Sequence, residues 1–155
     1  MLQRIQTIWL FLATATIFCL FLFPFIHFTD FDGIAKAIKA TGVYQNLNGQ
    51  VVQTKPFIAL TIATVIIGLV PFAIIFFYRN RKKQIILSYI TILLILAYSF
   101  WLVQTSKQEV GNLTLEFENY GIGVLLPSLA IFFIILALRG IRHDENLIRS
   151  TNRLR

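Results

Sequence analysis

Four long apolar runs dominate the pattern of hydrophobic and polar positions along the chain. They cover about residues 8–26, 57–78, 85–103 and 121–138, and none of them contains Asp, Glu, Lys or Arg. A helix needs about 20 apolar residues to cross the hydrocarbon core of a bilayer. The pattern therefore predicts four transmembrane helices in one membrane domain that covers residues 1–155.

The polar segments between the runs carry weaker signals for local structure. Residues 34–39 predict a short helix, and Asn48-Gly49 within the β-prone segment 43–53 predicts a hairpin. Residues 113–118 alternate between apolar and polar side chains, which predicts a half-buried strand. A lone hairpin is marginal in water, so we expect this strand to pair with it. The predicted fold class is an all-α membrane protein, a four-transmembrane-helix bundle with a small extracytoplasmic β-sheet cap.

Composition supports lipid as the solvent of the apolar runs. Hydrophobic residues make up 57% of the chain and charged residues 14%, against about 45–50% and about 25% in soluble domains. The formal net charge of +7 would suggest nucleic acid in a soluble protein. Here the cations lie beside the apolar runs, where membrane topology and anionic headgroups account for them. We therefore expect no nucleic-acid partner.

The distribution of Lys and Arg predicts the orientation in the membrane. Ten of the 14 lie on one side of the predicted bundle and the other four on the opposite side. Because the Lys- and Arg-rich loops of membrane proteins stay in the cytoplasm, both termini are predicted to be cytoplasmic. The outer loops are then about residues 27–56 and 104–120, and the cytoplasmic tail is 139–155.

The cytoplasmic cations are the predicted contacts for anionic lipid headgroups or a partner protein. In the tail, Ile141 and Ile148 are seven residues apart, which on a helix makes an apolar stripe. The tail is either such a helix, lying on the membrane or on a partner, or a frayed basic segment that fixes topology. His143, Asp144 and Glu145 in the tail are expected to be solvated. The predicted contact residues are Arg79, Arg81, Lys82, Lys83, Arg142 and Arg149.

No catalytic, cofactor-binding or metal site is predicted. Membrane enzymes and ion-coupled transporters usually carry an ionisable group at depth, and these runs have none. Their hydroxyl side chains are expected to bond their own helix or a neighbour. His27 lies near Asp30 and Asp32, but a metal site needs three or four converging ligands, and we interpret the group as an interfacial His beside capping carboxylates. Pro71 and Pro127 each predict a bend in a span.

The opening Met1-Leu2-Gln3-Arg4-Ile5-Gln6-Thr7-Ile8-Trp9-Leu10 resembles the start of a family of short bacterial membrane proteins of unknown function, found in Bacteroidota. Its members begin with a Gln-Arg-Ile-Gln stretch and have four spans, a long first outer loop and a basic turn like Arg79-Asn80-Arg81-Lys82-Lys83. The resemblance covers nearly the whole chain. It implies the inner membrane of a Gram-negative cell, and it implies no activity and no functional residues.

Three functions remain as alternatives at this point. The leading hypothesis is a non-catalytic accessory or scaffold subunit of an inner-membrane complex, with a membrane protein partner or a second copy of the chain. The alternative is a small channel, transporter or lipid-binding membrane protein that uses bends at Pro71 and Pro127. The third is an enzyme with a site at the outer surface, around His27, Asp30, Asp32 and Glu116.

Overall fold

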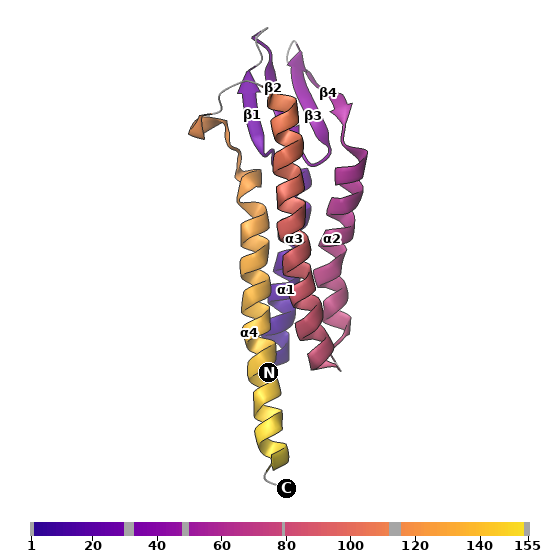
Figure 1. Cartoon of the computed structure of the whole chain (residues 1–155), viewed down its shortest axis with the longest axis vertical. Helices are drawn as coiled ribbons and strands as arrows, with labels where there is room; N and C mark the ends of the chain where they lie inside the picture. Colours follow the sequence, from indigo (N-terminus) through magenta and orange to yellow (C-terminus); the bar gives the residue numbers. More distant parts are fainter. Residues whose placement is uncertain (1, 30–32, 48–49, 79, 112–115, 154–155) are drawn as a thin grey trace.

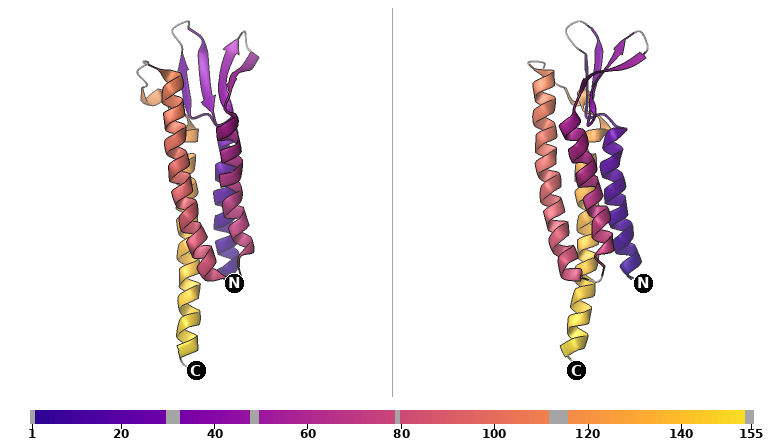
Figure 2. Two further views of the ribbon diagram at one scale, coloured as in Figure 1. Left: turned by 45° about the vertical axis from the view of Figure 1, so that its right-hand side comes forward. Right: turned by 90° about the vertical axis from the view of Figure 1, so that its right-hand side faces the viewer.

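Helices lie side by side along the long axis of the molecule, and a small sheet covers one end (Figure 1). The computed structural model describes residues 2–29, 33–47, 50–78, 80–111 and 116–153. Both ends of the chain lie at the end of the bundle opposite the sheet, and α4 extends past the other helices there (Figures 1 and 2). The helices of the described chain are α1 (Leu2–Phe18), α2 (Ile58–Phe76), α3 (Arg81–Val110) and α4 (Leu126–Arg153).

Three helical segments are long and apolar enough to cross a membrane: Ile58–Phe76, Arg81–Val110 and Ile122–Asn146. The apolar helix Ile5–Phe21, formed by α1 and the 3-10 turn η1 (Cys19–Phe21), is shorter. Large apolar side chains cover the outside of the bundle, including Leu93 and Phe100 at mid-helix on α3. An apolar outer surface is what a helix bundle presents to lipid, so the helices are compatible with a membrane protein.

Several hydroxyl side chains are buried in the interior of the helix bundle. Ser88 and Thr91 of α3 are fully buried and donate hydrogen bonds to carbonyl oxygens one turn earlier on the same helix. Thr64 of α2 bonds its own helix and also the Tyr98 hydroxyl of α3. The expectation that span hydroxyls bond their own helix or a neighbour is confirmed for these groups. The Thr64–Tyr98 bond joins two helices in an environment where apolar burial contributes little to their association.

The sheet is antiparallel and its strands follow chain order, β1-β2-β3-β4. Ile26 pairs with Ile38, and Ile38 with Val43, so these side chains share one face. That face is buried and belongs to the same core cluster as Ile17 and Leu102 of the helices. The sheet therefore packs on the end of the bundle. Its strands are β1 (Ile26–Thr29), β2 (Ala35–Lys39), β3 (Gly42–Leu47) and β4 (Gln50–Pro56).

The predicted helix at 34–39 is wrong, because Ala35–Lys39 forms strand β2. Ala and Lys are good helix formers, but such preferences are small per residue, and strand pairing on both sides with burial of Ile38 outweighs them. The predicted hairpin is confirmed by the pairing of β3 with β4. Its turn at Asn48-Gly49 lies outside the described residues.

The predicted strand at 113–118 is wrong where it can be judged. Residues 112–115 lie outside the described part, and Phe117–Asn119 forms a 3-10 turn, η2, with Phe117 96% exposed. This loop still contacts the sheet, but at β1: Tyr120 forms an isolated bridge with Ile26, and the Gly121 N–H donates to the Phe25 carbonyl at 2.7 Å. In the described residues, the backbone of this loop thus meets the sheet at the β1 edge and not at the hairpin.

The predicted bend at Pro127 is also wrong. Since α4 begins at Leu126, Pro127 lies in the first helical turn, where its missing N–H has no intrahelical partner to lose. Pro71 lies buried inside α2, which continues on both sides of it. At the other end of α4 the predicted tail is helical as far as Arg153, and Ile141 is fully buried.

Candidate functional site

The two edges of the sheet differ in how they are covered. At β1, the bridge to Tyr120 and a 2.9 Å hydrogen bond from the Asn119 amide to the His27 carbonyl oxygen cover the edge. Every residue of β4 is exposed, with Val51 at 69%, and no further strand pairs with β4 in the described part of the chain. An open edge strand offers unpaired N–H and C=O groups to another chain. β4 is therefore the candidate docking edge.

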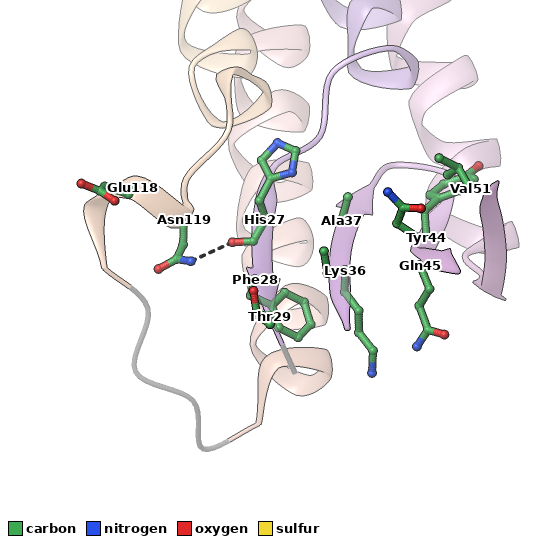
Figure 3. A pocket seen from close by; sticks show the side chains of 12 residues that line it. His27, Phe28, Thr29, Lys36, Ala37, Tyr44, Gln45, Val51, Glu118 and Asn119 are labelled. Atoms are coloured by element: carbon green, nitrogen blue, oxygen red, sulfur yellow. Dashed lines mark hydrogen bonds between the residues drawn. The ribbon is translucent and has the colours of Figure 1, made fainter. Parts of the chain in front are cut away.

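An open hollow of about 540 Å³ runs along the sheet from β1 and η2 and reaches β4 at Val51 (Figure 3). Its lining comes from all four strands and from η2, and it mixes amide, hydroxyl and apolar groups. In Figure 3 the His27 ring and the Glu118 carboxylate lie apart, on opposite sides of Asn119. The lining residues are His27, Phe28, Thr29, Ala35, Lys36, Ala37, Tyr44, Gln45, Asn46, Val51, Glu118 and Asn119.

Several polar side chains in and beside the hollow form structural contacts. The Tyr44 hydroxyl is 2.8 Å from the Thr41 hydroxyl, and the Lys39 ammonium lies 5.4 Å from the centre of the Tyr44 ring. Glu116 caps η2 through a reciprocal bond with Asn119. These contacts stiffen a surface suited to hydrogen bonding and apolar contact.

Of the residues of the third hypothesis, the structure describes His27 and Glu116, and the Asn119 side chain bonds the backbone of both, accepting from the Glu116 N–H and donating to the His27 carbonyl oxygen. Asp30 and Asp32 lie outside the described residues, His27 is on β1, and Glu116 caps η2. Within the described chain, no three His, Cys, Asp or Glu side chains gather in a way that could hold a metal ion.

The predicted basic contacts that the structure describes lie at the opposite end of the bundle. Arg81 is half-buried in the first turn of α3, with Nη1 4.0 Å from Asp144 Oδ2. The Arg142 guanidinium lies 5.2 Å from the centre of the Tyr89 ring. Lys82 and Lys83 are exposed. Two further predicted contacts lie outside what the structure describes, Arg79 altogether and Arg149 for its side chain.

Sequence reasoning missed a buried polar pair at this end, formed by Gln6 and Asp144. The expectation that Asp144 is solvated is wrong: Asp144 is 7% exposed and accepts a 2.7 Å hydrogen bond from the Gln6 amide. Gly140 lies beside Gln6, and a Cβ at Gly140 would come within 2.9 Å of Gln6 Cγ. Helical spacing could have revealed the pair, because Asp144 continues the three- and four-residue steps of the buried face of α4. That face consists of Leu126, Ala130, Ile134, Ala137, Leu138, Ile141 and Asp144.

Comparison with known proteins places the chain in a family without assigning it an activity. No curated protein matches the sequence. One family model, described as a domain of unknown function (DUF4293), matches residues 2–154, which is nearly the whole chain. The protein therefore belongs to the DUF4293 family.

Proposed function

We propose that this protein is a multi-pass inner-membrane protein that crosses the bilayer four times, with both termini in the cytoplasm. Three helical segments have the length and composition of spans. The fourth, Ile5–Phe21, would rise about 26 Å at about 1.5 Å per residue, close to the roughly 30 Å core of a bilayer. Ten of the 14 Lys and Arg residues fall in the sequence segments assigned to the side with Lys82 and Lys83. That side then faces the cytoplasm, where exposed Lys82 and Lys83 contact anionic headgroups.

Within that membrane placement, we infer a non-catalytic accessory or scaffold role. The observation that carries it is the open edge of β4, exposed along its whole length while the β1 edge is covered. An edge strand without a partner can pair with other chains and so promote aggregation. Addition of a partner's extended segment to β4 would satisfy the edge by backbone hydrogen bonds. The hollow beside Val51 would receive the side chains of that segment.

Purification of the tagged protein from native membranes tests this role. A partner should be retained at constant stoichiometry, and Val51→Lys combined with Val52→Lys should release it, because Lys on an edge strand opposes pairing. Phe117→Lys is the matched control, since Phe117 is also apolar and exposed but lies in η2. Retention of the partner by both variants, or the absence of any stoichiometric partner, would contradict the proposal.

A second candidate function is lipid binding. It is one of the functions in the alternative hypothesis of a small channel, transporter or lipid-binding membrane protein. An apolar cavity at the outer end of α3 and α4 favours it. Pro127 gives no support for a gate, because it lies in the first turn of α4 and not in the middle of the helix.

A further inference from the structure

A second cavity lies between α3, β1 and the start of α4. It has a volume of about 190 Å³, below the roughly 300–1,000 Å³ of sites for drug-sized ligands. It exists because α3 continues toward the sheet past the point where α4 begins (Figures 1 and 2). Leu102 and Val103 line it from α3, Val124 lines it from the segment before α4, and Pro127 lines it from the first turn of α4.

Most of the cavity lining is apolar, and the Ser99 hydroxyl in it already has a hydrogen-bond partner. The Ser99 hydroxyl is satisfied by a 2.7 Å bond to the Ile95 carbonyl of its own helix. Val103, Tyr120, Val124 and Ser128 are exposed, so the cavity opens to the side of the bundle. In a protein that spans the membrane, that opening faces lipid.

One charged side chain lines the cavity, that of exposed Lys107. Within the described part of the chain the Lys107 ammonium has no salt-bridge partner. The nearby carboxylate of Glu109 is neutralised by Lys55, at 2.5 Å. Lys107 lies two turns from Ser99 toward the sheet end, about 12 Å at about 1.5 Å per residue. The cation is thus placed toward the outer interface, above an apolar cleft.

We propose that this cavity binds one acyl chain of an anionic phospholipid from the surrounding outer leaflet, with Lys107 contacting the phosphate of its headgroup. The inference rests on the proposed membrane placement. An apolar cavity open to the side of the bundle suits an acyl chain, and a cation at its outer rim that forms no salt bridge with the described residues suits an anionic headgroup. Tyr120, half-exposed at the same rim, is an amphipathic ring of the kind that prefers the interface.

The test uses the full-length protein reconstituted into vesicles of equal parts phosphatidylcholine and phosphatidylglycerol. Resistance to carbonate extraction is measured first, and co-purifying lipids are then counted by native mass spectrometry. Wild type should retain one phosphatidylglycerol in preference to phosphatidylcholine. Lys107→Ala should lower that preference about fivefold, the factor equivalent to about 1 kcal/mol for one Lys at an anionic surface. Ser128→Trp should abolish retention by filling the cavity.

Lys39→Ala is the matched control, because it removes one cation from the same end of the molecule without touching the cavity. Unchanged preference in Lys107→Ala, or unchanged retention in Ser128→Trp, overturns the site and leaves the membrane placement standing. Equal retention of both lipids by the wild-type protein would overturn the proposed preference for an anionic headgroup. If carbonate extracts the wild-type protein from the vesicles, the proposed membrane placement is overturned, and the lipid site with it.

Discussion

The Gln6 side-chain amide donates a 2.7 Å hydrogen bond to Asp144 Oδ2, joining two residues that are 138 positions apart. Both are buried, Gln6 at 8% and Asp144 at 7% exposed. The bond connects the first turns of α1 to the extension of α4, and Arg81 of α3 lies 4.0 Å from the same carboxylate. Three helices therefore meet at one polar cluster at the basic end of the bundle.

Gln6→Ala should lower the free energy of unfolding by about 1–3 kcal/mol, because it leaves a buried carboxylate without its closest donor. The quantity is measured by denaturant unfolding in detergent micelles. Asp144→Asn is the comparison variant, since the Gln6 amide can still donate to the Asn oxygen. Asp144→Asn should therefore lose less stability than Gln6→Ala, and equal losses in the two variants would show that the Gln6 hydrogen bond is not what stabilises the cluster.

The junction of the two outer loops depends on close backbone approach at Gly121. A Cβ there would collide with the Pro24 carbonyl oxygen, so Gly121→Ala should separate the loop from β1 at a cost of about 1–3 kcal/mol. Protease cleavage of the outer loops should accelerate while the circular dichroism of the helices stays unchanged. Ile122→Ala, next to it and 61% exposed, should behave as wild type. Identical cleavage of both variants would refute this account.

The hydroxyl pair Thr64–Tyr98 joins α2 to α3 inside the bundle. Interhelical hydrogen bonds in membrane proteins average about 0.6 kcal/mol. A double-mutant cycle with Thr64→Val and Tyr98→Phe should therefore give a coupling free energy near that value, measured by unfolding in mixed micelles. The coupling stays small because the Thr64 hydroxyl keeps its bond to the Leu60 carbonyl in Tyr98→Phe. Additive effects of the two substitutions would mean that the pair contributes nothing to helix association.

The proposed topology predicts which positions an impermeant thiol reagent reaches in spheroplasts. With the native Cys19 replaced by Ala, Gln50→Cys on exposed β4 should react, and Asn80→Cys before α3 should react only after the membrane is permeabilised. Both residues are exposed, so burial does not explain a difference. Labelling of Asn80→Cys in intact spheroplasts would reverse the proposed orientation.

Local signals were reliable where neighbouring residues alone decide the structure. The hairpin was predictable because Asn-Gly between β-prone segments favours a tight turn, and β3 does pair with β4. The long apolar runs were predictable because helix formation and apolar composition both depend only on the residues within each run. The prediction failed for 34–39, where the helical preference of Ala and Lys is overridden by pairing with strands on both sides.

The sequence by itself determined the apolar helices, the hairpin and the separation of a basic end from the other end, because each follows from the period or composition of a contiguous stretch. Only the tertiary structure decided that β1 and β2 complete the sheet, that Gly121 meets Phe25, and that Asp144 is buried against Gln6. These contacts join residues far apart in the chain. Their free energy depends on how helices and loops pack, and no local pattern of residues encodes that packing.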